Sequence, residues 1–128
     1  EDGRGTTRAT ILPAYIEIML AVEDMPAAQA GADELAEMAG RLDAPFLRAL
    51  AAGARGAIRL AEGDPRAALG PLREACRFWE DLEVPYELAR TRGLIGRACE
   101  RLGDADSARM EFDTARWYLR ELGASPEL

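Results

Sequence analysis

Histidine, lysine and asparagine are absent from this sequence of 128 residues, and only two cysteines are present. Without an imidazole, no Ser-His-Asp or Cys-His nucleophile system and no histidine metal site can be assembled. Cys76 and Cys99 are too widely spaced for a Cys-x-x-Cys redox or zinc pair, and two cysteines do not make a disulfide framework. We therefore expect a non-catalytic chain from a reducing compartment, the cytoplasm, that needs no metal and no other cofactor.

Positive charge is also scarce, because 16 arginines stand against 23 acidic residues and leave a net charge of −7. This is the wrong sign for a chain whose main task is to neutralise nucleic-acid phosphates. The longest apolar run, residues 11–22, is broken by Pro13 and Glu17 and is shorter than the roughly 18 to 20 residues of a membrane span. We expect neither a nucleic acid nor a membrane as a partner.

The chain starts at Glu1 without an initiator methionine, and residues 1–5 are polar and rich in glycine. We interpret these residues as a connector and the chain as a fragment of a longer protein. The composition is rich in alanine and arginine and lacks lysine and asparagine, which is typical of a GC-rich, bacterial coding genome.

The sequence repeats itself at an offset of 40 residues without any gap. Asp24, Asp64 and Asp104 align at this offset. The other aligned residues are Ala28, Ala68 and Ala108; Leu42, Leu82 and Leu122; Pro45 and Pro85; Gly53 and Gly93; Gly56 and Gly96; and Gly63 and Gly103. Matching glycines, prolines and aspartates are hard to explain by composition alone. We therefore predict a single helical-repeat domain over residues 1–128, with about three repeat units at residues 6–41, 45–82 and 86–122.

Turn signals recur about every 20 residues and divide each unit into two helices. Asp64 followed by proline is typical of an N-cap and a first helical turn. Gly63, Gly103 and Gly123 stand where a helix commonly ends in a left-handed residue. These signals predict helices at residues 6–22, 26–41, 45–61, 65–82, 86–102 and 105–122, and no strands.

Apolar residues at helical spacing form one stripe on each second helix, as Ala68, Leu72, Ala75 and Trp79 show. The first helices are apolar over a wider arc, which fits helices packed between neighbours on two sides. The pattern predicts an all-α fold in which two-helix units stack into an α-α superhelix.

Two kinds of residue are unfavourable inside these helices. Each interior glycine costs about 1 kcal/mol relative to alanine. We expect that Gly53 and Gly56, and the equivalent pair forty residues later, are explained by close approach between helices. Pro13 and Pro71 are each expected to kink their helix or delay its start.

A two-helix unit with alanine at the inner turn and a Leu-Gly-Asp break resembles the tetratricopeptide repeat, although its period exceeds the usual length of about 34 residues. Residues 72–90, which end in Glu-Leu-Ala-Arg, and the later Leu102-Gly-Asp104 resemble the repeats of large LuxR-type, ATP-dependent bacterial transcription regulators. Glu83 departs from that pattern, which has glycine at this place. The resemblance implies an interaction segment, with the ATPase P-loop and the DNA-reading helix carried by other parts of a longer protein.

Two functions are open at this point. The first is a protein-binding or effector-binding segment of a LuxR-like transcription regulator, whose partner is a protein, a peptide or a small effector. The second is a tetratricopeptide-like adaptor or scaffold domain of a bacterial signalling protein unrelated to transcription. A helix-turn-helix at the C-terminus of the full-length gene would favour the first, and a cyclase or kinase domain would favour the second.

Arginines supply the candidate partner groove. Arg48, Arg55 and Arg59 lie on one stripe of a first helix, and Arg90, Arg97 and Arg101 have the same spacing on the next first helix. In tetratricopeptide-like arrays the first helices line the concave groove, so these guanidinium groups are candidates to bind acidic peptides or carboxylates. The stripes are offset by 42 residues rather than 40, which turns one about 200° from the other. The alternative is two solvated faces with ion pairs to Asp and Glu.

The last helix supplies a candidate interface, because its apolar face carries no polar substitutions of the kind expected in a capping repeat. The residues concerned are Phe112, Trp117, Tyr118, Leu119 and Leu122. Trp117 aligns with an arginine of the preceding unit and is expected to lie off the core stripe. In the isolated chain we expect this face to pair with a second copy as a two-fold homodimer.

Two further groups of residues have two interpretations each. Cys76 and Cys99 are either a redox pair or small buried hydrophobic residues. Phe78 and Trp79, with the aromatic residues of the last helix, either form a platform for a ligand or pack in the core.

Overall fold

The computed structural model describes the backbone of residues 2–123 and the side chains of residues 11–123. Residues 1 and 124–128, which the predicted domain includes, lie outside the described residues. The described part forms six α-helices and no strand, which confirms the all-α prediction. The helices are α1 (Asp2–Ala21), α2 (Met25–Leu42), α3 (Pro45–Ala61), α4 (Pro65–Leu82), α5 (Pro85–Arg101) and α6 (Ala105–Glu121). The ends of α2 to α6 lie within one residue of the expected positions, but α1 begins in the stretch expected to be a connector.

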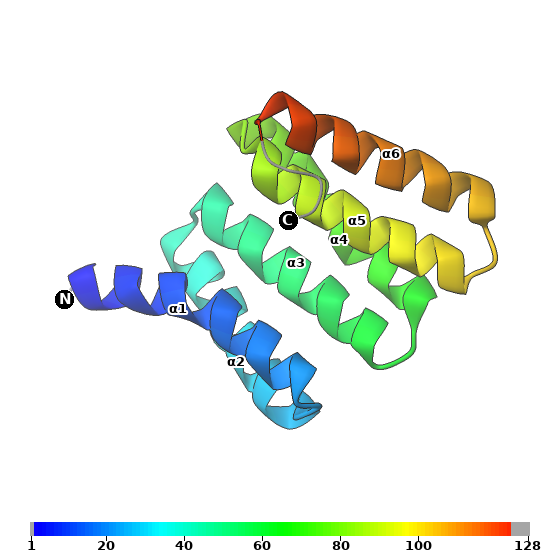
Figure 1. Ribbon diagram of the computed structural model, residues 1–128. Coiled ribbons are helices and arrows are strands. Elements are labelled where there is room, and N and C mark those ends of the chain that lie inside the picture. The colour runs from blue at the N-terminus through cyan, green and yellow to red at the C-terminus, as the bar shows by residue number, and fades with distance from the viewer. Residues whose placement is uncertain (1, 124–128) are drawn as a thin grey trace.

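Consecutive helices pack against each other in sequence order, and α3 also contacts α1 and α5. Over the described residues, α2, α4 and α6 make no comparable contact with one another. Figure 1 shows α1, α3 and α5 following one another as a row. Because only the first helices approach each other, the array curves toward the face that α1, α3 and α5 share.

The turns repeat more regularly than the sequence signals indicated. Backbone φ is positive at residues 20 apart: Glu23, Asp43, Gly63, Glu83, Gly103 and Gly123, with values between 50° and 88°. The left-handed helix ends predicted at the three glycines are confirmed. Glu83 adopts the same conformation, so the turn is kept at the place where the regulator repeats that residues 72–90 resemble have glycine.

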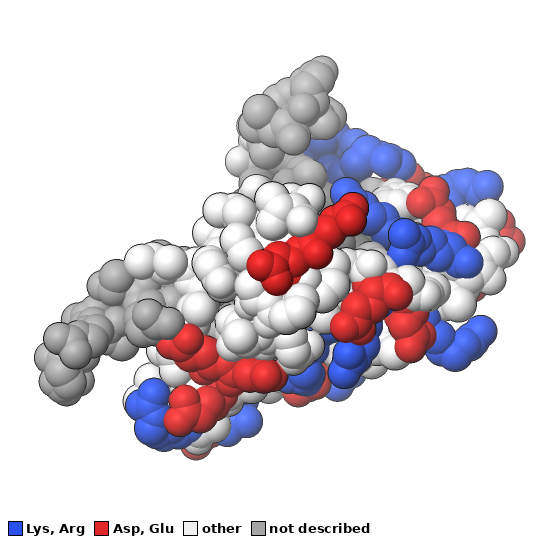
Figure 2. Space-filling model, turned by 90° about the horizontal axis from the view of Figure 1, so that it is seen from below, with Lys and Arg blue, Asp and Glu red and all other residues white. Residues whose placement is uncertain are grey.

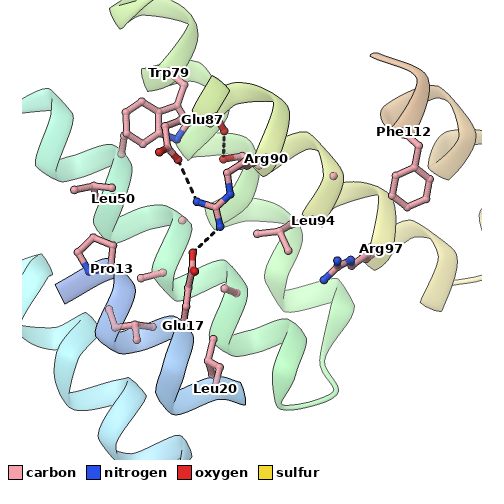
Figure 3. A pocket seen from close by; sticks show the side chains of 17 residues that line it. Pro13, Glu17, Leu20, Leu50, Trp79, Glu87, Arg90, Leu94, Arg97 and Phe112 are labelled. Carbon is pink, nitrogen blue, oxygen red and sulfur yellow. Dashed lines mark hydrogen bonds and ion pairs between the residues drawn. The ribbon is translucent and has the colours of Figure 1, made fainter. Parts of the chain in front are cut away.

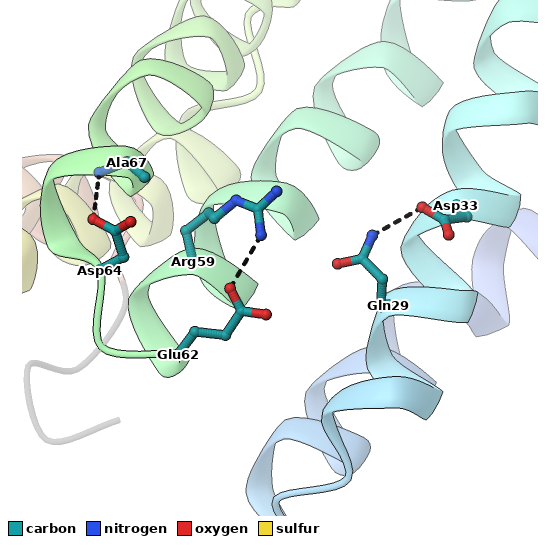
Figure 4. A network of polar contacts seen from close by, with 6 residues as sticks. All are labelled: Gln29, Asp33, Arg59, Glu62, Asp64 and Ala67. Atoms are coloured by element: carbon teal, nitrogen blue, oxygen red, sulfur yellow. Dashed lines mark hydrogen bonds and ion pairs between the residues drawn. The ribbon is translucent and has the colours of Figure 1, made fainter.

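Aspartate caps open the second helix of each pair. The side chains of Asp24, Asp64 and Asp104 each accept a hydrogen bond of 3.1 Å from the backbone N–H three residues later. Figure 4 shows this bond at Asp64. These carboxylates satisfy N–H groups that have no partner inside the helix, and they lie at its positive end.

Both interior prolines lie within continuous helices, so neither delays the start of its helix, and a kink is the expected effect that remains. Pro13 lies inside α1, and Pro71 lies inside α4. A proline has no N–H to donate, and its ring displaces the carbonyl one turn earlier, so a bend is the usual result. Figure 1 shows that α1 changes direction along its length.

Glycine allows close helix packing at two of the four predicted positions. A Cβ atom on Gly56 would lie 2.5 Å from Cγ of Leu72, and one on Gly96 would lie 2.7 Å from the ring of Phe112. The expectation is wrong for Gly53 and Gly93. A Cβ on Gly93 would meet no atom within 4 Å, and one on Gly53 would only touch Cβ of Ala75 at 3.9 Å.

Candidate ligand-binding groove

A pocket of about 420 Å³ lies on the concave face, lined mainly by α1, α3 and α5. Its walls are largely apolar: Leu20, Leu50 and Leu94 line it from the three first helices, and Trp79 and Phe112 close it from α4 and α6. Figure 3 shows these side chains around the pocket. Its size and lining are typical of sites that hold an organic ligand or a peptide side chain.

The pocket is lined by the same face of each first helix. Pro13, Gly53 and Gly93 occupy equivalent positions forty residues apart, and all three line it. Four residues further on, Glu17, Ala57 and Arg97 line it as well. The groove is therefore a product of the repeat, and its chemistry is set by which side chains occupy a few equivalent positions.

Arg90 lies at the mouth of this pocket, bound by two carboxylates. It donates a hydrogen bond of 2.5 Å to Glu17 and lies 3.7 Å from Glu87. Glu17 is 73 residues away in the sequence, so this ion pair joins α1 to α5 across the groove (Figure 3). The hydrogen bond that Arg90 donates to Glu17 raises the pKa of Arg90 above its usual value. Arg90 is therefore fully charged and already holds a carboxylate.

Arg97 lines the same pocket two turns along α5 and has no hydrogen-bond or ion-pair partner among the described residues. Both carboxylates that line the pocket, Glu17 and Glu87, lie on Arg90. The exposed guanidinium of Arg97 is therefore the pocket cation whose charge no described side chain neutralises.

The other four arginines of the predicted groove do not line the pocket. Arg48 pairs with Asp43 at 2.7 Å, Arg55 with Glu74 at 3.2 Å, and Arg59 with Glu62 at 3.0 Å (Figure 4). Arg101 donates a hydrogen bond of 2.8 Å to the carbonyl oxygen of Leu60. The structure therefore brings together only Arg90 and Arg97 of the six.

Arg92 is a structural residue that the sequence did not single out. It bridges Glu80 of α4, at 2.9 Å, and Glu111 of α6, at 3.1 Å. Burial lowers the pKa of Arg92, but its hydrogen bonds to Glu111 and Glu80 outweigh this and raise it. Its partners come from two other helices, so no local pattern in the sequence could have shown the contact.

Both cysteines are buried, and neither forms a disulfide. Burial is the largest effect on Cys76 and raises the pKa of its thiol from 9.0 to about 11. The pKa of Cys99 is raised for the same reason. A thiol with a raised pKa carries little thiolate near neutral pH, so these environments favour the interpretation as small hydrophobic residues over a redox pair.

The aromatic residues are divided between core and surface. Trp79 is only 2% exposed and contacts Phe46 edge to face at a centroid distance of 5.3 Å. Trp117 is 51% exposed, as expected for a residue off the core stripe, and lies 5.2 Å from the ring of Tyr118.

The candidate interface on α6 is only partly apolar surface. Trp117 and Leu122 are exposed, whereas Phe112, Tyr118 and Leu119 are partly buried. Phe112 lies against Gly96 and also lines the groove, so it faces the interior of the array and not a partner beyond α6.

On the face shown in Figure 2, basic and acidic side chains are interspersed. No group of three or more residues able to ligate a metal occurs among the described side chains. None of the described helices is long and apolar enough to cross a membrane. Comparisons with protein-family models, curated proteins and solved structures gave no match.

Proposed function

We propose that this chain is a non-catalytic binding module whose concave groove holds an acidic peptide segment of a partner protein. The observation that carries the proposal is the pair Gly53 and Gly93. Both lie in the middle of a helix, both line the pocket, and neither has a positive φ.

Neither packing nor backbone conformation explains these two glycines. Each has room for a Cβ, and alanine would stabilise its helix by about 1 kcal/mol. A larger side chain at either position would instead enter the pocket. The glycines keep open a space that nothing in the described chain fills, which supports a ligand as the occupant.

The arginines indicate the chemistry of that ligand. Arg90 and Arg97 are seven residues apart on α5 and line the same pocket, so they can hold two acidic groups along one segment. Glu17 already forms an ion pair with Arg90, in the way that a carboxylate of the ligand would. Guanidinium groups bind carboxylates through paired hydrogen bonds. The leucines and aromatic rings of the walls suit apolar side chains between the acidic ones.

The wider proposal is a stack of three tetratricopeptide-like units in a LuxR-like transcription regulator. The recurring aspartate caps and left-handed turns, with helices packed in sequence order, support the repeat type. The regulator itself rests on the resemblance of residues 72–104. The alternative, an adaptor domain of a signalling protein, would use the same groove, and the domains encoded beside this segment distinguish the two.

A peptide array tests groove binding. The labelled chain is applied to immobilised peptides that combine Asp or Glu with Leu or Phe, and to the same peptides with Lys in place of the acidic residues. We expect binding to acidic peptides only. Gly93→Leu fills the pocket and should abolish binding. Gly40→Leu is the matched control, because Gly40 also lies inside a helix with open space around it but lies outside the pocket.

Two outcomes would contradict the proposal. The first is that the wild-type chain binds no acidic peptide, or binds the lysine peptides equally well. The second is that Gly93→Leu binds as tightly as Gly40→Leu. Arg97→Glu tests the role of charge independently of the pocket volume, because it leaves the pocket open. It should weaken the binding of acidic peptides by about tenfold or more, which corresponds to the loss of one charged hydrogen bond.

A further inference from the structure

An uncharged, exposed stripe runs along α1 on the side away from the groove. Ile11, Ile18 and Val22 are 56%, 57% and 63% exposed, and Tyr15 is 40% exposed. Ala14 and Ala21, also exposed, lie beside them. We call these six residues the α1 stripe. At 100° per residue, they lie about 180° around the helix from the α1 residues that line the groove.

The equivalent positions of the later repeat units indicate what packs against this face. Ile11 and Ile18 are equivalent to Ala51 and Ile58 of α3, which are 3% and 1% exposed. Those two residues belong to the core cluster formed by α1, α2 and α3, so they pack toward the helices that precede α3. The same positions of α5, Thr91 and Ala98, are 6% and 0% exposed. At these two positions, both later first helices are therefore buried, whereas α1 is exposed.

The spacing of the α1 stripe indicates a helix as the occupant. Ile11, Tyr15 and Ile18 of α1, and Val22 directly after its last residue, follow each other by four, three and four residues. This is the spacing of a seam between two paired helices. A hollow of about 330 Å³ adjoins the stripe and can accept a side chain from that helix. It is lined by Ile11, Leu12 and Tyr15 of α1 and by Ala30, Gly31 and Glu34 of α2.

Helix α6 of another copy is a poor occupant. Its outward positions include the exposed Met110 and Trp117, but charged residues lie beside them. Arg109, Asp113 and Arg116 have side chains that are 69%, 61% and 54% exposed, and Arg116 binds Asp113. Burying these charges against isoleucine and valine would remove water from them without providing new partners. Head-to-tail stacking of copies is therefore disfavoured, and so is the α6 face as the site of the predicted homodimer.

We propose that the α1 stripe is a homodimer interface, in which α1 of one chain packs against α1 of a second copy about a two-fold axis. The stripe is its own best complement, because it is apolar, carries no charge and has helix-pairing spacing along its whole length. A two-fold contact of this kind uses the same surface on both chains and closes after two copies. It leaves both grooves open on the opposite faces of the paired helices.

Analytical ultracentrifugation of the wild-type chain tests this proposal. We expect a dimer, twice the chain mass of 13.9 kDa, that dissociates on dilution. Ile18→Glu places one charge per chain in the seam and should weaken the dimer by at least about a hundredfold. Ile11→Glu should act in the same direction. Met110→Glu is the matched control, because Met110 is 70% exposed on α6, so its charge lies at the other end of the array.

The outcomes are separable from loss of folding. Ile11 and Ile18 are exposed, so both variants should keep the circular dichroism spectrum and the thermal unfolding midpoint of the monomeric chain. A wild-type chain that is monomeric at all concentrations would overturn the proposal and would point to a helix of a different polypeptide segment as the occupant. A dimer that survives both glutamate substitutions, or that Met110→Glu dissociates, would also overturn it.

Discussion

Gly96 of α5 lies directly against the ring of Phe112 of α6, so closely that a Cβ at Gly96 would stand 2.7 Å from a ring carbon. The equivalent contact forty residues earlier joins Gly56 to Leu72. In the first unit the large residue lies on the first helix and the small one on the second. Ile16 occupies the position of Gly56 and Gly96, and a Cβ on Gly31 of α2 would lie 2.9 Å from it. A small residue opposite a large one thus recurs at each helix pair.

This contact predicts opposite effects for two neighbouring glycines. Gly96→Ala forces the Phe112 ring to move and should lower the free energy of unfolding by about 1 to 3 kcal/mol. Gly93→Ala meets no atom within 4 Å and should raise it by about 0.5 to 1 kcal/mol. Urea unfolding followed by circular dichroism measures both. Equal effects of the two substitutions would show that Gly96 is not held by close packing.

The ion pair between Glu17 and Arg90 should compete with the ligand. Both side chains are substantially exposed, so Glu17→Gln should change stability by less than about 1 kcal/mol. The substitution frees Arg90 for a ligand carboxylate and should tighten binding of the acidic peptide about two- to fivefold, as measured by fluorescence anisotropy. Glu62→Gln, which removes a carboxylate paired with Arg59 outside the pocket, is the control. Weaker binding by Glu17→Gln would show that Glu17 contributes to the ligand site.

Arg92 and Arg97 are five residues apart on α5 and should behave differently when their charge is removed. Arg92→Met breaks the link between Glu80 and Glu111 and should destabilise the fold by about 1 to 2 kcal/mol. Arg97→Met removes no described contact and should change stability by less than about 0.5 kcal/mol. Chemical unfolding of the two variants compares them, and a larger loss for Arg97→Met would refute its assignment as an unpaired groove cation.

The Cys76 thiol should react slowly in the folded chain. Its pKa is raised from 9.0 to about 11, so the folded state favours the neutral thiol. Its contribution to stability is complete below pH 9 and declines as the pH rises toward 11, because the unfolded chain ionises first. A thiol reagent at pH 8 should modify Cys76 at a rate that rises sharply in urea. Equal rates in the folded and unfolded chains would contradict this environment.

Helix positions were largely predictable because their signals are local. A cap such as Asp64 and a left-handed residue such as Gly63 act within a few residues. Because the sequence repeats, each of these signals occurs two or three times. The connector assigned to residues 1–5 was wrong, because helix α1 starts at Asp2, and polar composition alone does not decide between a helix and a coil.

The groove was predictable in outline but not in its residues. The register of 40 residues does place Arg90 and Arg97 at positions that line the pocket, whereas Arg48 and Arg55 occupy the positions of the buried Leu88 and Ile95. The partner of Arg90 lies 73 residues away, and such pairs depend on how whole helices stack. No local signal distinguishes a glycine that permits packing from one that keeps a pocket open.

The most direct test of the central claim is a map of where an acidic peptide binds, obtained from backbone amide NMR shifts of the labelled chain during titration. We predict that shifts concentrate around Gly53, Gly93 and Arg97 and extend to α1 near Glu17. They should disappear in Gly93→Leu and persist in Gly40→Leu. Shifts confined to the outward faces of α2 or α6, or unchanged in Gly93→Leu, would contradict the assignment of the concave groove as the binding site.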